Sequence, residues 1–231
     1  MITCLLAAAP LATALGDFDE AALFKACPGV AAFYEKQSAE KEQVPVIATD
    51  KARKATLLER VAEDQALRDV LIRDMSNVES VSKVNEVDAR NLTWLKADIE
   101  QRGFPARAEV GDDGMRAAWL LIQHADSDRA FQKKALETFV AEPDRYGVRK
   151  DDIALLTDRT LVGDGKPQRY GSQFDNDGER LVMQPVEAPE SLDSRRASMG
   201  LPPIADYGCM MHTMYGKEVD ITPRGAASAQ R

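Results

Sequence analysis

Apolar residues recur at intervals of three and four along residues 50–75, and Leu57 and Leu71 are two of them. This spacing places them on one face of an α-helix. Charges of both signs fall between them, Glu63 and Asp64 included, which is typical of a solvated helix face. We therefore predict a long amphipathic helix here.

The same periodicity continues through residues 76–102, with Val84 and Leu95 among the repeating positions, and it stops at Gly103. Glycine directly after a helical stretch is a C-terminal signal, because it adopts a left-handed conformation without steric cost. A second long helix is predicted, followed by a turn-rich loop over residues 103–114 in which Asp112 or Asp113 caps the next helix.

Shorter helical patterns follow this loop. An apolar run over residues 114–124 reads as a buried helix that ends at His124, and further helices are predicted over 126–141 and 151–162. The glycines and proline of residues 163–167 end the last of these.

The two ends of the chain are less regular. Residues 17–43 predict one or two short helices, broken at Cys27-Pro28-Gly29. Near the C-terminus, short runs at 168–173 and 181–186 flank Asp177-Gly178, a dipeptide that favours a β-hairpin. The predicted fold is mainly α: a helical N-terminal arm and a bundle-like helical domain with a short C-terminal β-hairpin.

Composition narrows the classes of partner. The chain carries 30 lysines and arginines against 38 aspartates and glutamates, a net charge of −8. Nucleic-acid binding requires clustered positive charge, so this class is disfavoured. The sequence also has no phosphate loop, dinucleotide fingerprint or nucleophile elbow.

The first fourteen residues contain no charged side chain and are rich in leucine and alanine. Residues 1–14 resemble the apolar core and small-residue cleavage site of a secretory signal peptide, although a basic segment is missing. They are too short to span a membrane. We expect a periplasmic or secreted protein; the alternative is a cytoplasmic protein with a short apolar N-terminal helix.

Removal of such a leader would leave two cysteines, Cys27 and Cys209. In an exported protein two cysteines can form one disulfide, and two independent thiols are the other interpretation. The sequence has no cluster of cysteine and histidine residues of the kind that forms a structural zinc site.

His124 is the main candidate for chemistry, since imidazole acts as an acid or base near neutral pH. Asp158 could orient it, and Arg159 could bind an anion. The opposing interpretation is structural: His124 would hold a helix end by hydrogen bonds, and the Asp158-Arg159 pair would form bridges within a helical bundle. We predict no metal ion and no cofactor.

Several amide and phenol side chains complete the candidate site. Gln132, Gln168, Tyr170 and Gln173 suit the recognition of a polar ligand, such as a sugar or a peptide. The same side chains would equally suit a polar core in which every group is hydrogen-bonded.

Some of these residues form a combination of motifs, read here in chain order: Gly103-Phe104-Pro105, Val110-Gly111, Gln123 to Asp126, Phe131-Gln132, Asp158-Arg159, Pro167 to Gln173, Arg195-Arg196 and Tyr207. This combination resembles a bacterial family that is described only as a domain of unknown function. Ser172 stands where that family usually has threonine, and a hydroxyl is kept. The resemblance implies boundaries and candidate residues, but no reaction.

Together these features predict a helical N-terminal region at 15–87, a family-like domain at 88–215 and a disordered tail at 216–231. Two functional hypotheses remain. The chain is a hydrolase or polar-ligand binder of the cell envelope that uses His124 and Asp158, or it is a non-enzymatic interaction protein in which these residues form a structural network.

Overall fold

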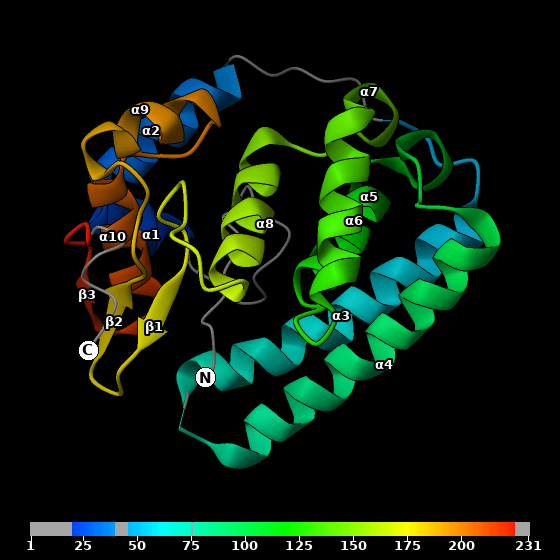
Figure 1. Cartoon of the computed structure of the whole chain (residues 1–231), viewed down its shortest axis with the longest axis horizontal. Coiled ribbons are helices and arrows are strands. Elements are labelled where there is room, and N and C mark those ends of the chain that lie inside the picture. The colour runs from blue at the N-terminus through cyan, green and yellow to red at the C-terminus, as the bar shows by residue number, and fades with distance from the viewer. Residues whose placement is uncertain (1–19, 40–45, 75, 225–231) are drawn as a thin grey trace. The chain divides into compact units, whose positions relative to one another are not determined.

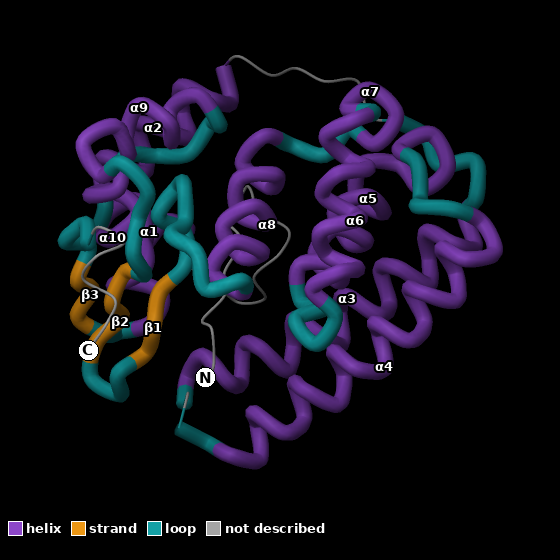
Figure 2. The backbone as a smooth tube through the Cα atoms, viewed as in Figure 1, coloured by secondary structure: helices purple, strands orange, loops and turns teal. Residues whose placement is uncertain are grey.

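The computed structural model describes residues 20–39, 46–74 and 76–224, and most of these residues are helical (Figures 1 and 2). The prediction of a mainly α protein with an N-terminal helical arm and a small C-terminal sheet is confirmed. The signal peptide expected at residues 1–14 lies outside the described residues.

The chain folds as two compact units. The first unit contains α1 (Glu20–Ala26), α2 (Pro28–Ala39), α8 (Lys150–Gly163), β1 (Phe174–Asn176), β2 (Arg180–Met183), the 3-10 helix η1 (Pro189–Ser191), α9 (Leu192–Ser198), α10 (Ile204–Tyr215) and β3 (Glu218–Asp220). The second unit contains α3 (Lys51–Arg73), α4 (Val78–Arg102), α5 (Arg107–Gln123), α6 (Arg129–Ala141) and α7 (Pro143–Tyr146).

In the second unit α3 and α4 lie side by side, and α5 packs against both (Figure 1). Asp50 begins α3 by accepting a hydrogen bond from the amide of Arg53, and Asn77 begins α4 in the same way. Gly103 ends α4 with a φ of 75°, in the left-handed region that favours glycine. Both long helices predicted from the sequence are thereby confirmed.

α5 begins earlier than the sequence predicted. It starts at Arg107, inside the expected loop, and Gly111 interrupts it with a φ of 73°. The carboxylate of Glu109 accepts a hydrogen bond from the amide of Ala106 at 3.1 Å and so starts this extra turn of helix. Asp112, one of two aspartates expected to cap the following helix, instead accepts a hydrogen bond from the amide of Val46 at 3.1 Å.

A buried arginine joins the three helices near the start of α3. Arg53, only 2% exposed, donates to Asp98 of α4 at 2.9 and 2.5 Å and to Glu109 of α5 at 2.9 Å. A fourth bond reaches the carbonyl of Gly103 at 2.6 Å. The charge of this arginine is therefore compensated, as burial of an ion requires.

In the first unit a disulfide between Cys27 and Cys209 joins the N-terminal helices to α10, with 6.0 Å between the two Cα atoms. The structure thus selects pairing over the two free thiols that the sequence also allowed. This bond fixes α1 and α2 to the C-terminal part of the chain.

The small sheet has the strand order β1-β2-β3. β1 and β2 form the hairpin predicted around Asp177-Gly178, with Phe174 opposite Met183. β3 pairs in parallel with β2 and places Val219 opposite the buried Leu181. The prediction of a disordered tail from residue 216 is therefore wrong for residues 218–220, because backbone pairing with β2 orders them. The final residues, 225–231, lie outside the described part of the chain.

Across the described ranges, the helices are all either too short or too polar to cross a lipid bilayer.

Candidate functional site

His124 lies at the end of the buried helix α5, where it is the C-cap residue. The sequence predicted this position, because the apolar run that ends there is buried on almost all sides. Gln132 of α6 holds the turn in place: its side-chain amide donates to the carbonyls of Ile122 at 3.2 Å and Gln123 at 3.0 Å. The structure gives Gln132 a supporting role beside His124, and ligand binding by Gln132 stays a prediction.

The imidazole of His124 faces a carboxylate of α3. Nδ1 of His124 lies 2.9 Å from Oδ2 and 3.1 Å from Oδ1 of Asp64. Both side chains are buried, with exposed fractions of 4% for His124 and 1% for Asp64. An imidazole bonded to a carboxylate at Nδ1 carries its proton on that nitrogen, so the pairing fixes the tautomer and the orientation of the ring.

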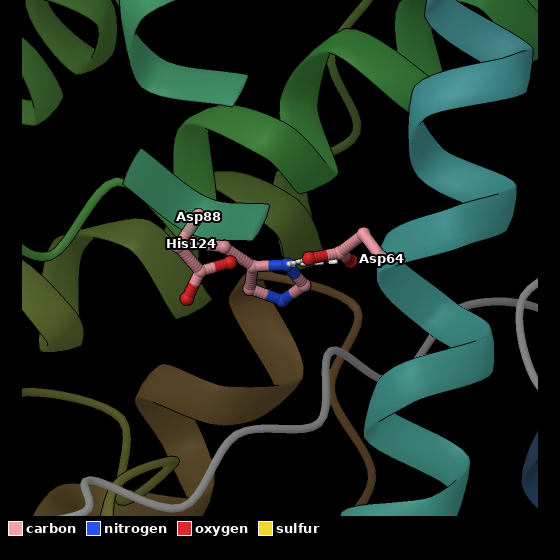
Figure 3. A group of neighbouring side chains, drawn as sticks. All are labelled: Asp64, Asp88 and His124. Carbon is pink, nitrogen blue, oxygen red and sulfur yellow. Dashed lines mark hydrogen bonds and ion pairs between the residues drawn. The ribbon is translucent and has the colours of Figure 1, made fainter. Parts of the chain in front are cut away.

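A second carboxylate approaches from α4. One ligand atom each from Asp64, Asp88 and His124 lies within 4.8 Å of the others. Figure 3 shows the imidazole turned toward Asp64, with Asp88 on the other side of the ring. Three helices thus bring three proton-binding side chains to one point in the second unit.

Arg68 links the two carboxylates. Its Nε lies 3.1 Å from Oδ1 of Asp64, one turn earlier on α3, and its Nη2 lies 2.5 Å from Oδ1 of Asp88. A single guanidinium therefore neutralises part of the charge of both. We call Asp64, Arg68, Asp88 and His124 the α3–α5 cluster.

The cluster shifts the pKa values of the two carboxyl groups in opposite directions. Burial alone would raise the pKa of Asp64, but the imidazole of His124 and the guanidinium of Arg68 outweigh burial and hold this pKa below its usual range. Burial raises the pKa of Asp88 to about 7; Arg68 opposes the rise, and the nearby charge of Asp64 adds to it. Near neutral pH Asp64 is ionised while Asp88 is part protonated.

The cluster can be considered as a metal site or as an acid–base site. Its carboxylate and imidazole atoms are of the type and spacing that a divalent ion accepts. Arg68, however, already binds one oxygen of each carboxylate, so an ion would compete with a guanidinium for the same negative charge. The donor set therefore fits proton transfer better than metal binding, and the absence of a metal stays a prediction.

The other predicted residues belong to the first unit, where α8 supplies Asp158. The carboxylate of Asp158 is fully buried and accepts hydrogen bonds from the amides of Arg169 at 2.7 Å, Tyr170 at 3.0 Å and Ser172 at 3.0 Å. The hydroxyl of Ser172 adds a further bond at 2.9 Å. Burial raises the pKa of Asp158, and these donors oppose the rise.

Further side chains hold the carbonyls of the same segment, residues 168–173. Gln168, also fully buried, donates to the carbonyl of Gln173 at 3.0 Å and accepts from its amide at 2.8 Å. The guanidiniums of Arg195 and Arg196 donate to the carbonyls of Arg169 at 2.8 Å and of Tyr170, respectively. Asp158 and Gln168 thus act as a scaffold for this segment, which we call the braced loop.

The braced loop explains why its motif contains so many polar residues. A loop without regular structure must still satisfy its buried backbone groups, and here side chains replace the partners that a sheet would supply. Gln173 is buried at 2% exposure and Tyr170 is half-buried, so Tyr170 is the more accessible of the two predicted ligand contacts. Arg159 is buried on α8 beside Asp158.

Three members of the α3–α5 cluster, Asp64, Arg68 and Asp88, were missed by sequence analysis. Asp64 was expected on a solvated face because charged residues surround it, yet it is buried at 1% exposure. It lies seven residues from both Leu57 and Leu71, which are buried too, so heptad spacing was a signal that could have located it. Asp88 directly follows the buried Val87, and its role emerges only when α4 lies against α3.

A family model for the family of unknown function DUF6624 matches residues 52–220. No curated protein and no solved structure matches the chain. Because the match covers most of the sequence, the chain belongs to this family. The matched residues include the whole α3–α5 cluster and the braced loop.

Proposed function

We propose that this chain is a hydrolase acting on a polar ligand and that its reactive centre is the His124–Asp64 pair. The observation that carries the proposal is the 2.9 Å contact between Nδ1 of His124 and the buried carboxylate of Asp64. A histidine oriented by a buried carboxylate is a recurrent device for general acid–base catalysis. With the proton on Nδ1, Nε2 is the nitrogen that exchanges a proton with a ligand or with water.

The energetics of the cluster support a functional origin. Two carboxylates packed against one guanidinium in a buried site contribute little to stability, since desolvation offsets their attraction. Apolar residues of similar size would serve packing at least as well. Ionisable groups with strongly shifted pKa values occur preferentially at functional sites. Asp88, whose pKa rises to about 7, has this property.

The non-enzymatic alternative is favoured by one observation. His124 and Asp64 have exposed fractions of only 4% and 1%, as expected for a structural network that joins three helices. In that case the protein would bind a partner by another surface, and the cluster would serve the stability of the second unit.

Thermal unfolding of the mature chain separates the two functions. The wild type, His124→Asn and Asp64→Asn are each heated with a library of polar envelope metabolites, and His212→Asn is the control for the exposed histidine of α10. A ligand that binds the native state raises the midpoint. We expect to find a ligand that raises the unfolding midpoint of the wild type and of His212→Asn but not that of His124→Asn. We also expect the wild type to hydrolyse this ligand. Variants that are merely less stable, with no ligand shift in any protein, would support the structural alternative.

We also propose export to an oxidising compartment, either periplasmic or extracellular. The Cys27–Cys209 disulfide supports this, because such bonds persist mainly outside the reducing cytoplasm. Fractionation of cells that express the full chain, with thiol trapping of each fraction, tests it. Recovery of the protein in the cytoplasm with both thiols reduced would contradict export.

A further inference from the structure

We propose that Asp88 is the second proton-transfer group of the α3–α5 cluster and acts as the proton donor while His124 acts as the acceptor. This inference rests on the proposed function and adds a second reacting group to the same site. Nothing in the sequence motifs pointed to Asp88, and only the packing of α4 against α3 and α5 brings it to the centre.

Asp64 and Asp88 bring two like charges into one site. Asp64 and Asp88 come from different helices, are both largely buried, and contact the same guanidinium of Arg68 at 3.1 and 2.5 Å. Two carboxylates in one desolvated site do not both ionise readily, because their repulsion is poorly screened. One of the pair therefore retains a proton at a pH where an isolated aspartate would have lost it.

The hydrogen bonds of the two carboxylates assign that proton to Asp88. Asp64 accepts hydrogen bonds from the imidazole of His124 at 2.9 Å and from the side-chain amide of Gln65 at 2.7 Å, and both bonds favour its ionised form. Asp88 accepts one hydrogen bond that favours its ionised form, from Arg68. The charged and titratable groups that face Asp88 are Asp64 and Arg68 on α3 and His124 at the end of α5.

Asp64, Asp88 and His124 differ in their access to solvent. The side chain of Asp88 is 20% exposed, compared with 1% for Asp64 and 4% for His124. Of the three, Asp88 is thus the group that solvent reaches most readily. A donor must be re-protonated after each reaction cycle, and this exposure supplies a route for the proton.

The two groups together balance a hydrolytic step. The oxygen of water bonds to the electrophilic atom of the substrate as the bond to the leaving group breaks. His124 takes one proton from the attacking water, and Asp88 gives its own proton to the leaving group. The enzyme is left with an imidazolium and a carboxylate, and the starting state is restored when His124 loses its proton to solvent and Asp88 takes one from solvent. Two groups with separated pKa values are the usual arrangement for such paired roles.

The test is a pH titration of the full chain labelled with ¹³C at the aspartate carboxyl carbons, followed by NMR with sequence-specific assignment. We expect the assigned signal of Asp88 to titrate near neutral pH, whereas Asp64 stays ionised over the whole range from pH 4 to 9. The signal should vanish in Asp88→Asn and persist in Glu86→Gln, which removes an exposed carboxylate from the same helix. Because the assignment is made in the wild type, the test does not depend on the folding of Asp88→Asn.

Two outcomes would overturn the proposal. If the assigned signal of Asp88 titrates below about pH 5, in the ordinary range, Asp88 is ionised at neutral pH and has no proton to donate. If Zn²⁺ added alone binds with one ion per chain and abolishes the Asp88 titration, Asp64 and Asp88 are metal ligands instead. Hydrolysis of p-nitrophenyl acetate, measured in parallel with wild type and His124→Asn, tests the proposed function separately. A His124-dependent rate without a neutral Asp88 titration would refute only the role of Asp88.

Discussion

Replacement of Asp158 by asparagine is expected to destabilise the first unit strongly, because this carboxylate organises the braced loop. Its two oxygens accept bonds from the amides of Arg169, Tyr170 and Ser172 and from the hydroxyl of Ser172. Asparagine has nearly the same shape, so the substitution removes acceptor capacity and charge without leaving a cavity. The matched control is Asp175→Asn on β1, where the side chain is exposed.

The magnitude follows from the hydrogen bonds that are lost. Asparagine keeps one of the two oxygens and replaces the other with an NH2 group, which is a donor. In either orientation this NH2 group faces at least two other donors; in one of them these are the backbone amide and the hydroxyl of Ser172. Hydrogen bonds to a charged group contribute about 1.5 to 3 kcal/mol each, so the expected loss is about 3 to 6 kcal/mol. This is a large part of the stability of an ordinary domain.

The assay is urea unfolding at pH 7, followed by far-UV circular dichroism, with wild type, Asp158→Asn and Asp175→Asn compared at equal chain concentration. We expect the midpoint of Asp158→Asn alone to fall. If the free energies of unfolding of Asp158→Asn and the wild type agree to within about 1.5 kcal/mol, the smallest loss expected from one such bond, the scaffold role of Asp158 is refuted. A chemical role for Asp158 would then become the better explanation of its place in the motif.

Three further perturbations test the fold and the cluster. Reduction of Cys27–Cys209, which are 182 residues apart, should cost up to about 5 kcal/mol by loop entropy, and the double serine variant should not respond to reductant in the same urea assay. The pKa of Asp88 rises from near 4 to about 7 on folding, so the proton on Asp88 contributes about 4 kcal/mol of stability that is fully present below about pH 4. The wild type should lose this contribution as the pH rises through 7, whereas Asp88→Asn should show no such loss. A flat stability profile for the wild type would contradict that shift. Arg53→Met should lower stability by about 3 to 5 kcal/mol because it removes the buried one of the two arginines that pair with Asp98, and an unchanged unfolding midpoint would show that the contact is dispensable.

Local signals in the sequence were sufficient for the helices. The spacing of leucines and valines located α3 and α4, and the stop at Gly103 fixed the end of α4. The hairpin around Asp177-Gly178 was equally local, since the turn residues determine it. These features depend on neighbours in the chain, which is why one sequence reveals them.

Features that depend on distant partners were not accessible in this way. β3 is ordered by its pairing with β2, and a strand of three residues is too short to show a periodic pattern in the sequence. Asp64 resembles its exposed neighbours on α3 until α5 covers it. The pairing of the N-terminal helices with α10 through Cys27 and Cys209 joins opposite ends of the chain, and two cysteines alone did not establish it.

The candidate residues were found as a group, but their roles could not be assigned from the sequence. Polar residues gather in the braced loop because backbone groups need partners, and the same composition would suit a ligand site. His124 was correctly singled out at the end of a buried helix. The carboxylate expected to orient it was Asp158, whereas Nδ1 of His124 is bonded to Asp64 in the structure.

The orientation of His124 by Asp64 is the central claim, and ¹⁵N NMR of the histidine rings in the full chain tests it most directly. We predict that neutral His124 carries its proton on Nδ1 and that Asp64→Asn changes both ring nitrogen signals of His124, while those of His212 stay the same. A neutral ring protonated on Nε2, or signals of His124 that are unaffected by Asp64→Asn, would contradict the account and remove the basis for an acid–base centre at this site.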